Sequence, residues 1–210
     1  MLPDDQDLYI TATCGISSNR VTRDERVIFE EAAATPGDFL VAAYRHSGIA
    51  YPKFFKMDNL SRLGWLAAEL LTQGQGLLEK YDPKRVGIVL SNASSSLDTD
   101  TRYYETTRDM ASPALFVYTL PNIVMGEICI RQGFKGENAF FITEAFDADF
   151  MQRYVTGLME EGNLDCCICG WVEILGAKYK TVLFLVEKSV LEVTHSQKFT
   201  TENIIKHYAL

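Results

Sequence analysis

The sequence predicts an α/β fold with a five-stranded mixed sheet and helices on both of its faces. Short apolar runs typical of buried strands alternate with longer stretches whose apolar residues follow the helical period. The last two apolar runs, 165–173 and 180–187, are only a few residues apart. This spacing leaves no room for a crossover helix and favours antiparallel pairing of neighbouring strands. The predicted order of elements is β-α-β-α-β-α-β-β.

The first half of the chain supplies two of these strands and several helices. Residues 8–14 predict the first strand. The segment 18–46 is predicted to be irregular, with helical pieces near 24–33 and 37–45, because it is rich in Ala, Glu and Leu but broken at Pro36–Gly37. Leu60, Leu63 and further apolar residues at helical spacing predict a helix over 59–75, which Asp58 or Asn59 can cap. The second strand is predicted over 85–91, followed by a polar loop over 92–101 and a short helix over 99–108.

The second half begins with a helix over 119–132, for which Thr119 can act as the cap and Pro121 suits the first turn. A buried strand over 138–143 comes next. A helix over 147–161 follows, with Asp147 or Asp149 at its N-terminus, where the helix dipole favours negative charge. A helix over 200–208 follows the two paired strands.

Composition narrows the possible function classes. The 210 residues are 47% hydrophobic and 23% charged, which is typical of a globular protein. The net charge of −8 argues against nonspecific binding to nucleic acid or to an anionic membrane. Residues 1–10 lack the features of a secretion signal, and no apolar run is long enough to cross a membrane, so we expect a cytoplasmic protein.

Two stretches of the chain resemble the β-ketoacyl synthase family of the thiolase-like superfamily. The first, residues 112–147, follows the pattern SPxxFxxxLPNxxxGxIxIxxGxxGxN and continues into an apolar strand and a Thr. The second, residues 56–64, follows Lys-Met-Asp-x-x-Ser-x-x-Gly. The resemblance covers most of residues 8–190. It implies one domain over 1–210 with a thiolase-like half fold, an insertion at about 18–50 and a C-terminal helix at about 200–208. The family's second half, which carries its His/His or His/Asn pair, has no expected counterpart.

The resemblance also implies that the catalytic nucleophile is missing. In the family the strand leads into an elbow, roughly Thr-Ala-Cys-Ala/Ser-Ser-Gly, whose Cys carries the acyl chain. Counted without gaps from Asn138, the elbow Thr matches Thr143, the next residue matches Glu144 and the Cys matches Ala145. Glu144 and Asp147 would also disfavour a thiolate. Glu144 is either a solvated or capping carboxylate or, after a one-residue bulge, the counterpart of the Gln that replaces the Cys in chain-length factors.

Other candidate groups favour structural roles. Cys166, Cys167 and Cys169 lack metal-ligand spacing and are predicted to be buried thiols, with Cys166 on the opposite strand face from the other two. Cys14 and Cys129 are predicted to be core residues. The remaining polar candidates share no motif with a partner group, and we expect neither a metal nor a cofactor. They are His46, His195, His207, Ser94, Ser95, Ser96, Asp98 and Asp100.

The sequence therefore predicts a non-catalytic ketosynthase-like protein, which we expect to be an accessory subunit in fatty acid, polyketide or aryl polyene biosynthesis. A half fold would expose the face that its second half covers, so we expect a homodimer or a heterodimer with a full-length ketosynthase. The candidate interface or acyl-channel residues are Phe116, Leu120, Pro121, Asn122 and Phe134; Tyr103, Tyr104 and Tyr118 are further aromatics that suit either the core or an interface. An acidic acyl carrier protein could dock on Lys53, Lys56, Arg62 and Arg131. Two alternatives are an acyl transferase or thioesterase that uses a Ser or a carboxylate, and a degenerate remnant that only folds.

Overall fold

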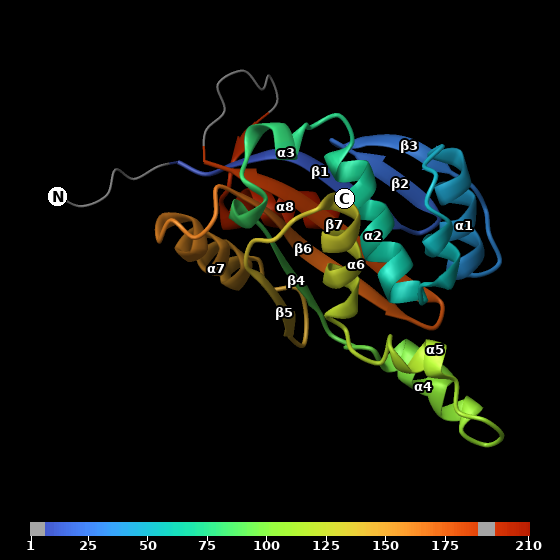
Figure 1. Ribbon diagram of the computed structural model, residues 1–210. Coiled ribbons are helices and arrows are strands. Elements are labelled where there is room, and N and C mark those ends of the chain that lie inside the picture. The colour runs from blue at the N-terminus through green and yellow to red at the C-terminus, as the bar shows by residue number, and fades with distance from the viewer. Residues whose placement is uncertain (1–6, 189–195) are drawn as a thin grey trace.

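The computed structural model describes residues 7–188 and 196–210, and its centre is one mixed sheet (Figure 1). Within these residues the sheet has eight strands in the order β3-β2-β1-β7-β6-β4-β5, with β8 beside β1. The strands are β1 (Tyr9–Ser17), β2 (Arg20–Arg23), β3 (Arg26–Glu30), β4 (Val86–Asn92), β5 (Asn138–Ile142), β6 (Cys166–Leu175), β7 (Lys178–Glu187) and β8 (Gln197–Lys198). The α/β class is confirmed, but the predicted number of five strands is too low.

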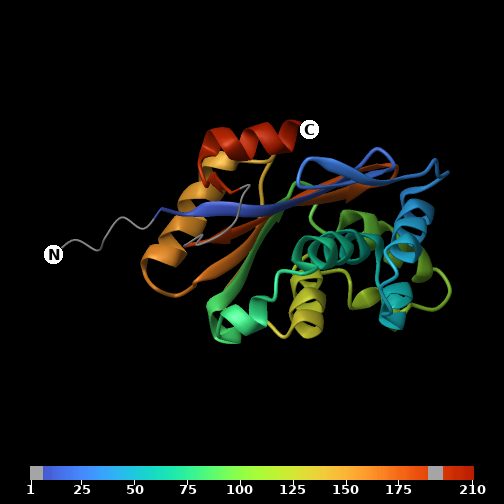
Figure 2. The ribbon, with the colours of Figure 1, turned by 90° about the horizontal axis from the view of Figure 1, so that it is seen from above.

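Helices cover both faces of this sheet (Figure 2). One apolar cluster packs α1 (Pro36–His46), α2 (Asn59–Thr72) and α6 (Ile123–Gln132) against one face, and a second packs α7 (Ala148–Glu160) and α8 (Thr201–Ala209) against the other. The shorter helical elements are η1 (Pro52–Lys56), α3 (Leu77–Lys80), η2 (Pro83–Arg85), α4 (Leu97–Thr106) and α5 (Pro113–Phe116). No helix in the described part of the chain is both long and apolar enough to cross a membrane.

The centre of the sheet agrees with the sequence prediction. Strands β6 and β7 pair antiparallel as neighbours, whereas β4 pairs parallel with both β5 and β6. Cys166 belongs to the cluster beneath α2, and Cys167 and Cys169 belong to the cluster beneath α7. The predicted alternation of these three cysteines on β6 is therefore confirmed.

The predicted helical piece over 24–33 is wrong, because residues 20–30 form the hairpin of β2 and β3. Two tight turns make this possible. Ser18 and Asn19 have φ of 49° and 59°, and Asp24 and Glu25 have φ of 48° and 64°. Two consecutive residues with positive φ give the turn twist that joins antiparallel strands directly. Glycine is the usual sign of such turns, and neither turn contains one.

The predicted cap at Thr119 is also wrong. The Thr119 hydroxyl donates to the carbonyl of Phe116 at 2.7 Å, within the turn that precedes α6. The helix α6 begins four residues later than predicted, after Asn122, which makes no side-chain cap bond. Ser112 provides the cap in this region, but for α5, where its hydroxyl accepts from Leu115 N at 3.3 Å.

The motif at 56–64 holds α2 tightly against its neighbours. Asp58, 4% exposed, caps α2 by accepting from Ser61 N at 2.9 Å, and its second oxygen accepts from the Thr99 hydroxyl at 2.6 Å. A side chain at Gly64 would collide with the Val124 side chain and lie 3.2 Å from that of Val172. Only glycine lets α2 approach α6 and β6 this closely, which explains the Asp and the Gly of the motif.

Candidate functional site

The candidate site is the elbow that joins β5 to α7. Thr143 N donates to the carbonyl of Asn92 at 2.9 Å, and the Thr143 hydroxyl donates to the carbonyl of Ala145 at 2.9 Å. Asp147 then caps α7 by accepting from Phe150 N at 2.9 Å. The strand and the helix therefore form where the sequence predicts them, and residues 143–147 join them.

This elbow carries exposed acidic side chains. Glu144 and Ala145 are both exposed, and Glu144 makes no hydrogen bond or ion pair with any described residue. Asp147 and Asp149 lie in the first turn of α7. A helix N-terminus favours an anion, and here Asp147 and Asp149 supply the negative charge.

The C-terminal helix α8 packs beside the elbow. The ring of Phe146 lies 4.5 Å from that of Tyr208 and 5.9 Å from that of Trp171, measured between centroids. Lys180 Nζ lies 4.3 Å from the Tyr208 ring centroid and donates to the Tyr208 carbonyl. The residue that follows the matched position thus helps to anchor α8 to the sheet.

The cysteines are buried or half-buried thiols. All five are free; four are buried in the sheet, and Cys129 is half-buried in α6. Burial raises the pKa of the Cys14 thiol to about 12 and also raises the pKa of Cys129. Thiols in such surroundings stay protonated and unreactive, as expected of core residues.

The histidines that the structure describes form no catalytic pair. His46 is exposed and its ring lies 4.7 Å from that of Phe29. His207 is buried, with Nδ1 3.6 Å from a Glu25 oxygen and Nε2 without a described partner. Neither His46 nor His207 makes a hydrogen bond with a described Ser, Thr or Cys, and His195 lies outside the described residues.

The residues predicted for an interface or acyl channel divide into two groups. Phe134 is 4% exposed and belongs to the core, as does Tyr118, whose hydroxyl donates to Glu127 at 3.1 Å. Phe116 and Leu120 are 60% and 58% exposed. Pro121 is half-buried and Asn122 is exposed.

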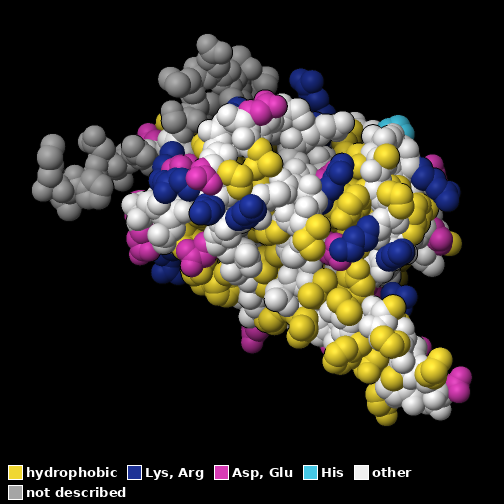
Figure 3. Space-filling model, viewed as in Figure 1, with side chains coloured by type: hydrophobic (Ala, Val, Ile, Leu, Met, Phe, Trp, Pro, Cys, Tyr) yellow, Lys and Arg dark blue, Asp and Glu magenta, His cyan; other side chains and the backbone are white. Residues whose placement is uncertain are grey.

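Phe116 and Leu120 belong to a larger apolar surface. The helices α4 and α5 form an arm that projects from the sheet, and exposed apolar side chains continue from it over the neighbouring edge of the body (Figure 3). We call the following exposed residues the arm surface: Leu97, Tyr104, Met110, Phe116, Val117 and Leu120. Beyond the arm, Ile142 on β5 is 51% exposed, and β5 is the last strand at its edge of the sheet. Sequence patterning did not predict that the arm would stand away from the core.

The predicted basic residues lie above buried carboxylates. Lys53 Nζ is 2.7 Å from Glu127, and Arg131 Nε is 3.2 Å from Glu69. Both carboxylate side chains are less than a tenth exposed, whereas the two cations remain more than a third exposed. Arg62 donates to the carbonyls of Phe54 and Phe55, and Lys56 is exposed. At Lys53 and Arg131 the exposed side chain of each ion pair is therefore the positive one, in a protein of net charge −8.

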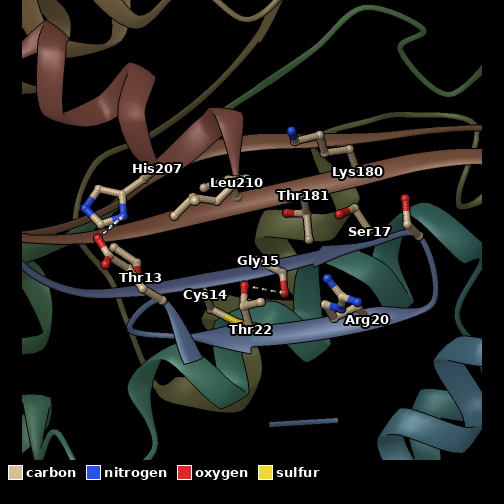
Figure 4. A pocket seen from close by; sticks show the side chains of 13 residues that line it. Thr13, Cys14, Gly15, Ser17, Arg20, Thr22, Lys180, Thr181, His207 and Leu210 are labelled. Atoms are coloured by element: carbon tan, nitrogen blue, oxygen red, sulfur yellow. Dashed lines mark hydrogen bonds and ion pairs between the residues drawn. The ribbon is translucent and has the colours of Figure 1, made fainter. Parts of the chain in front are cut away.

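The face of the sheet beside the end of α8 carries both polar and apolar side chains. A cavity of about 220 Å³ lies there between β1, β2, β7 and the end of α8 (Figure 4). Its lining includes Thr13, Ser17, Thr22 and Lys180. The polar members of this lining are stable in contact with water.

The comparisons find likeness in structure but not in sequence. No family model and no curated protein matches the chain. The "ishigamide ketosynthase/chain length factor" superposes with a TM-score of 0.63 at 17% identity, covering 86% of this chain and 62% of that one. A ketosynthase in complex with its chain length factor from Xenorhabdus doucetiae gives 0.56 at 13% identity, with 88% and 80% covered. A β-ketoacyl synthase from Burkholderia phymatum STM815 gives 0.60 at 13%, with 88% and 59% covered.

The chain thus spans about three fifths of the length of the first of these structures and most of its own length is matched. The chain has the thiolase-like fold of ketosynthases and chain length factors.

Proposed function

We propose that this chain is a non-catalytic accessory subunit that pairs with a ketosynthase in fatty acid, polyketide or aryl polyene biosynthesis. The observation that carries the proposal is the elbow. The strand, turn and helix that present a nucleophile in ketosynthases are all formed, yet Ala145 occupies the matched position and carboxylates surround it. We therefore expect no thiolate chemistry at this elbow.

The arm surface and β5 support pairing with another protein. Exposed apolar residues are ordinary when scattered, but a contiguous patch marks an interaction site. The outer edge of β5 pairs with no described strand, and Ile142 on that strand is more than half exposed. On the arm surface, Phe116 and Leu120 are also more than half exposed. Similar solved structures include a ketosynthase bound to its chain length factor. A ketosynthase is accordingly the partner that we assign to this surface.

The basic residues support a second contact, with an acyl carrier protein. Lys53, Lys56, Arg62 and Arg131 present positive charge, because the acidic partners of Lys53 and Arg131 lie beneath them. Opposite charge on an acidic carrier protein would speed its encounter with this face. One similar structure is a polyketide acyl-carrier protein in complex with its ketosynthase; it matches with a TM-score of 0.60 at 15% identity.

The test is affinity capture of the tagged chain from its own host, followed by reconstitution with the ketosynthase that is recovered. We expect a stable binary complex whose condensing activity depends on the partner's nucleophile and not on Glu144. Recovery of the chain alone, with no ketosynthase binding it after purification, would refute the pairing. Turnover of an acyl thioester by the isolated chain, abolished by Glu144→Gln, would instead establish the acyl transferase or thioesterase alternative.

A further inference from the structure

The β2–β3 hairpin forms the opposite edge of the sheet from β5. Strand β3 is the last strand in the order, and no described strand pairs with its outer side. Figure 2 shows the hairpin at the margin of the sheet, with α1 on one side of it and no helix on the other. An edge strand of this kind offers unpaired N–H and C=O groups to another strand.

The side chains of β3 are unusually apolar for a free edge. Val27 is 51% exposed and Ile28 is 39% exposed. The pairing of β2 with β3 skips Ile28, since Val21 lies opposite Phe29 and Thr22 opposite Val27. Ile28 thus has no cross-strand neighbour within its own chain, although it stands at the centre of the strand.

Charge is distributed along β3 in a self-complementary way. Arg26 begins the strand and makes no ion pair within the described residues. Glu30 ends it, followed at once by the exposed Glu31. Glu30 is bonded to Arg20 at 2.9 Å, but both of those side chains remain about half exposed. When two copies of such a strand run antiparallel, the basic end of each meets the acidic end of the other.

We infer that two copies of this chain associate through β3. The two strands pair antiparallel about a two-fold axis near Ile28, so that one sheet continues through both copies. Val27 and Ile28 are buried at the centre, and Arg26 of each copy faces Glu30 and Glu31 of the other. Opposite charges in such cross-strand positions are favourable, and the same patch serves both copies, as two-fold symmetry requires. This contact is separate from the β5 edge, so it does not depend on the proposed function.

The experiment measures self-association by sedimentation velocity at 0.15 M salt, where charges more than about 8 Å apart are screened. Wild-type protein is expected to show a concentration-dependent dimer. Arg26→Glu and Glu30→Arg, tested singly, each place like charges across the axis and should weaken the dimer on the order of tenfold. In a mixture of the two variants, opposite charges face each other again at both ends of the paired strands. The mixture should therefore restore the dimer as a species that contains one copy of each variant.

Two controls separate this contact from general effects. Lys135→Glu makes the same change in charge as Arg26→Glu, at an exposed position between α6 and β5, and should leave the dimer unchanged. Ile28→Cys should form a disulfide between copies on oxidation, and thermal melts should show that every variant is folded. A wild type that stays monomeric up to about 100 µM, or a dimer that neither single charge variant weakens, would overturn the inference. Retained binding of a ketosynthase by Arg26→Glu would show that the two contacts are independent.

Discussion

The Asp58 carboxylate provides the most direct test of how the motif at 56–64 stabilises the fold. Asp58→Ala removes two bonds at once, the cap to Ser61 N and the bond from the Thr99 hydroxyl. Loss of a helix cap costs about 1 kcal/mol, and loss of a buried hydrogen bond to a charged group about 2 kcal/mol. The free energy of unfolding should therefore fall by about 3 kcal/mol. For a chain of this size we expect Tm to fall by roughly 6–12 °C.

Asp147→Ala is the matched control. Asp147 caps α7 through one bond of the same length, 2.9 Å. It is exposed, however, and accepts no hydrogen bond from a described side-chain hydroxyl like that of Thr99. Its removal should cost about 1 kcal/mol. Urea unfolding followed by circular dichroism measures both variants.

A double-mutant cycle with Thr99→Val then isolates the bond between α2 and α4. If Asp58→Ala destabilises no more than Asp147→Ala, the buried bond to Thr99 adds nothing and our account of the motif is wrong. If the bond stabilises the fold, Thr99→Val should lower the free energy of unfolding less in the Asp58→Ala background than in the wild type.

Three further predictions concern the interface, the elbow and α8. Phe116→Ala should weaken binding to a ketosynthase by up to roughly 150-fold, because burying about 120 Å² of the ring at about 25 cal/mol/Å² contributes about 3 kcal/mol to the binding free energy. Calorimetry measures this loss, and the control Ile205→Ala on α8 should show none. In Ala145→Cys the new thiol should react slowly with iodoacetamide at about pH 7, and adding Glu144→Gln should accelerate it severalfold; equal rates would contradict the electrostatic argument. Burial lowers the pKa of His207 below 6.5, so the unfolded chain binds the proton more tightly than the folded chain does. The free energy of unfolding should therefore fall as the pH drops below about 6.5. In His207→Phe, the midpoint of urea unfolding should depend less on pH between about pH 5 and 8.

Periodicity and spacing predicted the centre of the fold correctly. The pairing of β6 with β7 was predictable because a short connection between two strands favours antiparallel pairing. The helix over 59–72 was predictable because its apolar stripe faces a core on several sides. In these segments local pattern and tertiary burial favour the same structure.

The hairpin at 20–30 was not predictable in the same way. Its two turns place Ser, Asn, Asp and Glu at positive φ, where a glycine would have indicated a turn. The strands are also rich in Arg and Glu, which are common in helices. The exposed arm was also missed, because helical spacing does not say whether a helix has a neighbour to pack against. Tyr118 and Phe116 lie two residues apart in one motif, yet one is buried and the other is exposed.

The geometry of the elbow between β5 and α7 does not require a nucleophile. Its geometry depends on backbone bonds from Thr143 and on the Asp147 cap, and neither needs a cysteine. An aspartate cap satisfies the free N–H groups of α7 and adds a charge that the helix dipole favours, so it stabilises the helix. The same charge opposes a thiolate one turn away. Stability and thiolate chemistry therefore make opposing demands on this helix end, and the sequence from Glu144 to Asp149 meets the first.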